Sequence, residues 1–147
     1  MKTVFHLGLK ATHYQEVIET LGNQLNEAGY VKDSYVDAVL ERESVLPTGL
    51  KTGSLNVAIP HTDMQHVNET VMAVATLDQP VKFNLMEDPS QEADVDIVFL
   101  LGVTKPKEQT ELLSALMSIF KDKERLEKIK EAKTESDCER ILNLVMA

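Results

Sequence analysis

Cysteine is nearly absent from this 147-residue sequence, in which Cys138 is the only one. A single cysteine excludes an internal disulfide framework and a four-cysteine zinc site. Long apolar runs are also absent, since none reaches the roughly 18–20 residues that are needed to span a bilayer. Residues 1–7 have neither the long apolar core nor the small-residue cleavage site of a signal peptide. We therefore expect a cytoplasmic protein without direct membrane insertion.

Positive charge is scarce as well. The chain has 15 lysines and arginines against 24 aspartates and glutamates, which gives a net charge of −9. Nucleic-acid binding needs a basic surface that neutralises phosphates, so this charge argues against a nucleic-acid partner and against anionic membrane surfaces. A basic protein partner fits the charge, but so does an acidic surface that serves only solubility.

The hydrophobic pattern predicts one α/β domain over residues 1–147, because no linker, repeat or low-complexity tract divides the chain. A strand, two helices, several strands and further helices follow one another, which is typical of a central mixed β-sheet covered by helices. Strands are expected at 3–7, 55–59, 70–77, 81–85 and 95–103, with a turn at 78–80 and a loop at 87–94. The most apolar strand, 95–103, is expected at the centre of the sheet.

Capping signals delimit the predicted helices. Residues 12–15 fit a capping box that begins at Thr12, and Gly29 stands where a C′ glycine ends a helix. A second helix is expected from residue 33 or 34 to about residue 43. The other helices are expected at 112–120 and after N-caps at Asp122 and Thr134, with Leu126, Ile129, Cys138, Ile141, Leu142 and Val145 buried.

One predicted strand ends at a proline that is followed directly by a histidine. Leu55, Val57 and Ile59 alternate with smaller or polar residues, as in a strand. Pro60 keeps Ile59 extended and has no N–H to continue the sheet, so the strand stops there. His61 is therefore expected at the carboxyl end of a buried strand, where ligands usually bind in open α/β sheets.

Imidazole is suited to carrying a phosphoryl group on nitrogen. With an ordinary pKa of about 6.5 it is mostly neutral at pH 7, and it needs no strong base beside it. A group that holds one ring nitrogen leaves the other free to attack. The residues alone leave two alternatives open. His61 is a surface histidine without function, or it joins Asp63 and His66 as a metal ligand, although the spacing is not that of the metalloprotease motif.

Two segments of the chain resemble a known family. Residues 58–61 read Ala-Ile-Pro-His, and residues 41–50 read Glu-Arg-Glu-Ser-Val-Leu-Pro-Thr-Gly-Leu. Together they are similar to the mannitol/fructose-type enzyme IIA domain of the bacterial sugar phosphotransferase system, and the resemblance covers nearly the whole chain. The Pro-Thr-Gly sequence and His66, five residues after His61, are most similar to the galactitol-specific branch. The resemblance implies a mixed sheet with helices on both faces.

The resemblance also implies a phosphoryl carrier. His61 would accept a phosphoryl group on Nε2 from phospho-HPr and pass it to a cysteine of enzyme IIB, in a system that includes the membrane enzyme IIC. Arg42 falls on the family's active-site arginine, which would stabilise charge on the phosphoryl oxygens. Without the resemblance, the favoured interpretation of Arg42 is an exposed helix arginine paired with Glu41 or Glu43. No metal or cofactor is implied, and Cys138 is not the phosphocysteine of enzyme IIB.

One position departs from the family pattern. Mannitol- and fructose-type members carry a second active-site histidine at the start of the helix after the central strand, where this chain has Gln109. Glutamine can donate a hydrogen bond to phosphate but cannot carry charge or move a proton. His66 is a candidate for the missing imidazole. Thr48, Ser54 and Asp63 are further candidates for contacts with phosphate, although loop hydroxyls often only form turns and Asp63 can instead orient a histidine.

Two competing hypotheses remain at this stage. The first is a regulatory binding module of the same fold, whose histidine is phosphorylated as a signal and feeds no transporter. The second is a metal-dependent hydrolase that uses His61, Asp63 and His66. The sugar does not follow from the sequence, because specificity in these systems lies mainly in the membrane component.

Overall fold

A five-stranded mixed sheet forms the centre of the computed structural model, which describes residues 1–144. The strands are β1 (Lys2–Leu9), β2 (Gly49–Leu50), β3 (Asn56–Ala58), β4 (Val71–Asn84) and β5 (Glu92–Gly102). Their order in the sheet is β1-β4-β5-β3-β2, so the predicted central strand is confirmed. β5 runs parallel to β3 and antiparallel to β4, which confirms the mixed sheet.

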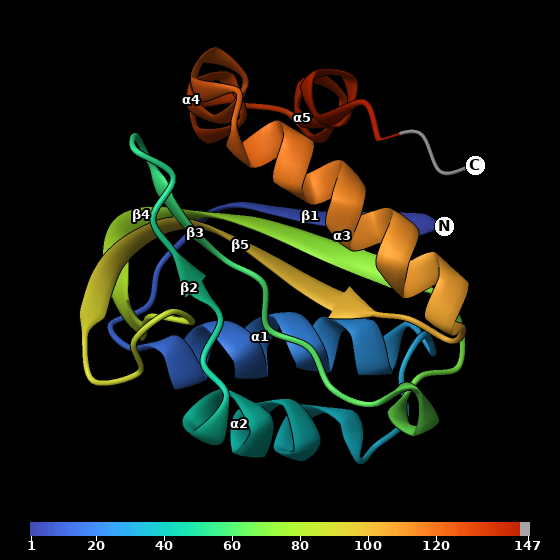
Figure 1. Cartoon of the computed structure of the whole chain (residues 1–147). Coiled ribbons are helices and arrows are strands. Elements are labelled where there is room, and N and C mark those ends of the chain that lie inside the picture. Colours follow the sequence, from blue (N-terminus) through green and yellow to red (C-terminus); the bar gives the residue numbers. More distant parts are fainter. Residues whose placement is uncertain (145–147) are drawn as a thin grey trace.

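Helices cover both faces of this sheet (Figure 1). They are α1 (Tyr14–Glu27), α2 (Tyr35–Val45), α3 (Pro106–Phe120), α4 (Lys123–Glu131) and α5 (Glu135–Leu142), with a short 3-10 helix, η1 (Met64–His66). α1 and α2 share one hydrophobic core with the sheet, and α3, α4 and α5 share a second core on the opposite face. The expected fold is confirmed. Within residues 1–144, no helix is both long enough and apolar enough to cross a membrane.

The prediction of a turn at residues 78–80 is wrong. β4 continues through these residues as one strand, with an irregularity in its pairing to β5 between Thr76 and Val81. Pro80 lies within this irregularity and is exposed, so its missing N–H interrupts no regular pair. The expected loop at 87–94 is shorter than predicted, because Glu92–Asp94 already pair with β4 as the start of β5.

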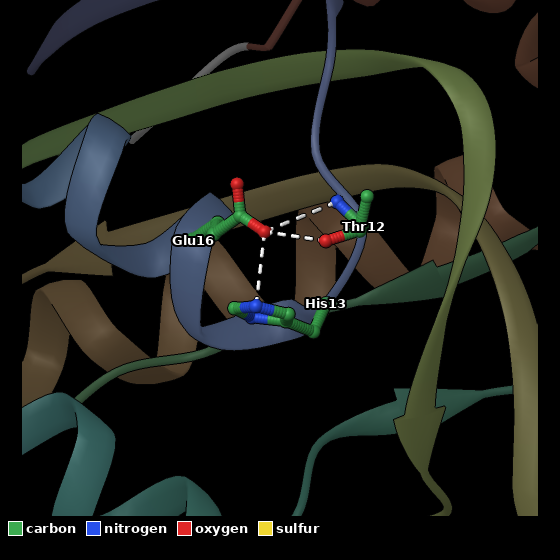
Figure 2. Close-up of polar contacts among 3 residues, drawn as sticks. All are labelled: Thr12, His13 and Glu16. Atoms are coloured by element: carbon green, nitrogen blue, oxygen red, sulfur yellow. Dashed lines mark hydrogen bonds and ion pairs between the residues drawn. The ribbon is translucent and has the colours of Figure 1, made fainter.

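The capping box predicted at residues 12–15 is also wrong, by one residue. The Thr12 hydroxyl donates to the carboxylate of Glu16, at 2.6 Å, rather than pairing with Gln15 (Figure 2). His13 is the N-cap residue of α1 and contacts the same carboxylate oxygen through Nε2 at 3.0 Å. Gly29, with φ of 85°, follows the C-cap residue as predicted.

The caps of the last two helices are confirmed. The side chain of Asp122 accepts from the backbone N–H of Arg125, and that of Thr134 accepts from Asp137. The buried side chains are those predicted, namely Leu126, Ile129, Cys138 and Leu142, with Ile141 half-buried. Val145 lies outside the described residues.

Candidate functional site

Hydrogen bonds hold the backbone at Ile59 and Pro60, the two residues before His61. Beyond the end of β3, the N–H of Ile59 donates to the Thr48 hydroxyl at 3.2 Å. The carbonyl oxygen of Pro60 accepts from Leu101 N of β5, at 3.0 Å. The proline ring restricts the backbone between these two bonds. The strand-proline-histidine segment therefore presents His61 from a chain with little freedom, at the carboxyl ends of the parallel strands β3 and β5.

The imidazole of His61 is half-buried and has one nitrogen engaged. Nδ1 lies 2.8 Å from the carbonyl oxygen of Ile59. Because a carbonyl only accepts, Nδ1 must carry the proton in this contact. In the neutral ring Nε2 then keeps its lone pair. The structure thus leaves Nε2 as the nucleophilic nitrogen of His61.

Burial lowers the pKa of His61 below its ordinary value, because an imidazolium is poorly solvated there. The positive charge of Arg42 lowers this pKa further. The contact with Ile59 and the negative charge of Asp63 act in the opposite direction and are outweighed. The ring is therefore neutral, and nucleophilic, to a lower pH than a free histidine.

An open cleft of about 340 Å³ adjoins His61. We call it the His61 cleft; its lining residues are Arg42, His61, Thr62, Asp63, Met64, Gln65 and Gln109. α2, the segment after β3 and the first turn of α3 contribute these residues. Residues far apart in sequence thus surround one volume that an anion of phosphoryl size can enter.

Arg42 has hydrogen-bond donors to spare in this cleft. Its Nη1 lies 3.8 Å from Oδ1 of Asp63, a long contact to a side chain that is 74% exposed. Its Nε is buried and has no hydrogen-bond partner within residues 1–144. A buried donor without a partner is costly, and the guanidinium that carries it belongs to a residue that lines the cleft, where an anion can accept from it. This geometry favours a functional arginine over one paired with a neighbouring glutamate.

Gln109 lies at the start of the helix that follows the central strand. It lines the His61 cleft from the first turn of α3, after Pro106 at the start of the helix. Glu108, beside it, accepts from the hydroxyls of Thr70 and Thr104 at 2.9 and 3.1 Å. These bonds tie the start of α3 to the residue before β4 and to the segment after β5. No sequence motif indicates this cluster, because Thr70 lies 34 and 38 residues before its two partners.

His66 does not line the His61 cleft. Its Nδ1 lies 2.8 Å from the hydroxyl of Ser34, the N-cap residue of α2. It borders instead a neighbouring cleft, which we call the His66 cleft, together with Arg42 and Asp63. The structure therefore offers no contact through which His66 replaces the family's second histidine at His61.

The two hydroxyl candidates are engaged elsewhere. The side chain of Thr48 is buried and donates to Glu43 while it accepts from Ile59. Ser54 lies in the loop before β3, where its hydroxyl and N–H contact Thr52. Neither residue borders the His61 cleft. Their geometry indicates structural bonds rather than direct contacts with phosphate.

The metal hypothesis has no geometric basis in the described part of the chain. In residues 1–144, no three or more His, Cys, Asp and Glu side chains gather so that they could hold an ion. His61, Asp63 and His66 therefore do not form the ligand set considered from the sequence. His61 and Asp63 border one cleft, whereas His66 faces α2.

Glu43 is a buried charged residue whose burial no sequence motif indicates. It follows Arg42 on α2, and both carboxylate oxygens accept from Thr48. Burial raises the pKa of Glu43 to about 7, although the bonds from Thr48 and the charge of Arg42 act to lower it. Only the tertiary structure shows this burial, because the Glu-Arg-Glu sequence reads as an exposed helix face.

Comparison with known proteins identifies the family of the chain. A family model described as "Phosphoenolpyruvate-dependent sugar phosphotransferase system, EIIA 2" matches residues 1–144. The chain is 34% identical over 150 residues to the mannitol-specific EIICBA component of Pasteurella multocida, an alignment that covers 99% of this chain and 22% of that protein. It is 29% identical over 109 residues to the galactitol-specific EIIA component of Escherichia coli K12, covering 74% and 72%.

A solved structure shows the same fold at a similar identity. The complex of the mannitol enzyme IIA with phosphorylated enzyme IIB from Escherichia coli matches with a TM-score of 0.79 and 25% identity, covering 94% of this chain and 92% of that one. The chain spans about a fifth of the length of the mannitol relative from Pasteurella. Mannitol- and galactitol-specific proteins are both relatives, so the similarity does not single out galactitol. The chain belongs to the EIIA 2 family of the phosphoenolpyruvate-dependent sugar phosphotransferase system, whose members are phosphotransferase components with a phosphohistidine intermediate.

Proposed function

We propose that this chain is a cytoplasmic phosphoryl carrier in which His61 receives the group from phospho-HPr and passes it to a cysteine of enzyme IIB. Enzyme IIB would then serve the membrane enzyme IIC of the same system. One observation carries the proposal. His61 keeps Nδ1 on the carbonyl of Ile59 and borders an open cleft with Arg42, so that Nε2 is left as the nucleophile.

For this transfer the protein must mainly align the two histidines and stabilise the negative charge of the phosphoryl oxygens. The Nε2 lone pair of His61 forms the new N–P bond while the N–P bond to the donor histidine breaks, and the leaving nitrogen takes that electron pair. Donor and product are both phosphohistidines, so the transfer is nearly isoenergetic and reversible. Arg42, and Gln109 with its amide N–H groups, would donate to the phosphoryl oxygens as charge spreads over them.

An apolar patch beside the His66 cleft supports docking of partner proteins. Val45 and Leu46, at the end of α2, are 68% and 55% exposed. Val45 also borders the His66 cleft with Arg42 and Asp63, so the patch lies close to the reactive residues. The solved mannitol relative is itself a complex with phosphorylated enzyme IIB. We infer that HPr and enzyme IIB use this same surface in turn.

For the sugar, we propose a galactitol-type system as the first to test. The support is the Pro-Thr-Gly sequence at 47–49 and the position of His66, five residues after His61. A mannitol-type system is the alternative outcome, because the mannitol-specific relative from Pasteurella has the higher identity over the longer alignment.

Incubation with phosphoenolpyruvate, enzyme I and HPr tests the proposal. We expect one acid-labile phosphoryl group per chain, with the ³¹P shift of an Nε2-linked phosphohistidine. Purified enzyme IIB from the galactitol and mannitol systems of Escherichia coli is then added separately, and loss of label from the chain identifies its acceptor. Absence of any label on the chain would refute the carrier function. Label that neither enzyme IIB removes would favour the regulatory module instead.

The pKa of His61 predicts a pH profile. Because this pKa lies below its ordinary value near 6.5, a larger fraction of the imidazole should stay neutral at each pH around 6.5 than in a free histidine. The rate of phosphoryl acceptance should fall as Nε2 becomes protonated, with the midpoint of that fall below 6.5. NMR titration of the His61 ring protons measures the pKa directly. A midpoint at or above 6.5 would contradict the prediction.

A further inference from the structure

A buried carboxylate lies behind the active-site strand. Glu43 is only 4% exposed, next to Arg42 in the last turns of α2. Its Oε2 accepts from the backbone N–H of Thr48, and its Oε1 accepts from the Thr48 hydroxyl, both at 2.8 Å. Burying a carboxylate carries a large desolvation cost, which these two bonds offset in part. The burial of Glu43 against Thr48 therefore needs an explanation beyond the packing of α2.

The Thr48 hydroxyl connects Glu43 to the residue that holds His61. The ionised carboxylate of Glu43 only accepts, so in that form the hydroxyl hydrogen of Thr48 points toward Glu43 and the lone pairs of the hydroxyl remain for other donors. The N–H of Ile59 donates to one of them at 3.2 Å. The carbonyl of the same Ile59 accepts from Nδ1 of His61 at 2.8 Å. Four residues thus form one line of hydrogen bonds from α2 to the imidazole.

The position of Thr48 is itself fixed. Gly49, the next residue, pairs with Ala58 in β3, and any Cβ there would lie 2.6 Å from the carbonyl oxygen of Asn84. The backbone of β2 therefore lies close against the end of β4, with no room for a side chain at Gly49. Thr48 meets Ile59 from a closely packed, hydrogen-bonded strand, which favours transmission of orientation along the line of bonds to the imidazole.

We propose that Glu43 and Thr48 are positioning residues for phosphoryl transfer, which hold Ile59 so that its carbonyl keeps the proton of His61 on Nδ1. The inference rests on the proposed function. Neither residue touches the phosphoryl group. Their effect is on the tautomer, because only the form with the proton on Nδ1 presents a lone pair at Nε2. A purely structural role would stabilise the fold without any change in the tautomer.

Two substitutions at Thr48 separate these roles. Thr48→Val keeps the shape but removes the acceptor for Ile59 N–H, whereas Thr48→Ser keeps the hydroxyl. The ¹⁵N shifts of the His61 ring in the isolated protein report the tautomer. We expect wild type and Thr48→Ser to hold the proton on Nδ1, and Thr48→Val to shift toward the form with the proton on Nε2. In transfer from phospho-HPr, Thr48→Val should lower kcat about tenfold, the equivalent of one hydrogen bond, with KM unchanged.

Glu43→Gln provides a second test if Thr48→Val does not fold, which thermal unfolding would show. Its side-chain oxygen can still accept from Thr48 N, but the amide nitrogen cannot accept from the hydroxyl. In Glu43→Gln the tautomer of His61 should shift toward the form with the proton on Nε2, as in Thr48→Val. A folded Thr48→Val protein, or failing that a folded Glu43→Gln protein, with the wild-type ¹⁵N shifts would overturn the inference. The ¹⁵N measurement of the tautomer uses the isolated protein and needs no partner. If the wild type fails to accept a phosphoryl group, the carrier function is refuted, while the ¹⁵N shifts still decide whether Glu43 and Thr48 set the tautomer of His61.

Discussion

Substitution of His61 by glutamine is expected to abolish phosphoryl acceptance, with a loss on the order of 10³-fold or more, as for other covalent nucleophiles. Glutamine can still donate to the Ile59 carbonyl, so the local hydrogen bond is retained while the nucleophilic lone pair is lost. No other histidine borders the His61 cleft. Transfer of ³²P from phosphoenolpyruvate through enzyme I and HPr, counted as acid-labile label on the chain, measures the effect.

His13→Gln is the matched control for this substitution. His13 is an exposed histidine that contacts Glu16 at the start of α1 (Figure 2). It borders neither the His61 cleft nor the His66 cleft. It should be labelled at the wild-type rate. Label that persists in a folded His61→Gln protein would mean that another residue accepts the phosphoryl group. The proposed role of His61 would then be wrong.

Replacement of Arg42 by methionine is expected to slow transfer by about 10²–10³-fold, the cost of losing a preorganised donor to the transition state. The methionine keeps an unbranched apolar stem where the arginine is partly buried, but it cannot donate to phosphoryl oxygens. Arg42→Lys should recover part of the rate, because it restores a point charge without the planar fork of donors. Rapid-quench measurement of single-turnover transfer from phospho-HPr gives the rate of the chemical step.

A second readout distinguishes this role from a change in stability. The charge of Arg42 lowers the pKa of His61, so Arg42→Met should raise that pKa in the NMR titration. Arg140→Met is the control, because Arg140 is an exposed arginine that pairs with Asp137 on α5. A single-turnover rate for Arg42→Met that equals the rate of this control would contradict a role in charge stabilisation.

Local features of the sequence were sufficient to predict much of this structure. The proline after Ile59 has no N–H and a restricted backbone, so it ends the strand and places His61 just beyond the strand end. This effect is local and does not depend on how distant elements pack. Apolar periodicity predicted the helices and the central strand, since those patterns depend on residues only a few positions apart along the chain. The same logic failed at Pro80, where pairing with β5 on either side continued a strand that the local turn signal would have ended.

The sequence by itself made His61 the candidate phosphoryl carrier, because imidazole chemistry, a strand that ends in proline and the family resemblance are all properties of the chain's own residues. Only the tertiary structure decided what surrounds it. Arg42 and Gln109 reach the His61 cleft from two helices on opposite faces of the sheet, whereas His66, five residues away in sequence, turns to Ser34. Glu43 became a buried support through its bonds to Thr48. Such contacts depend on how distant elements pack, which spacing along a chain does not encode.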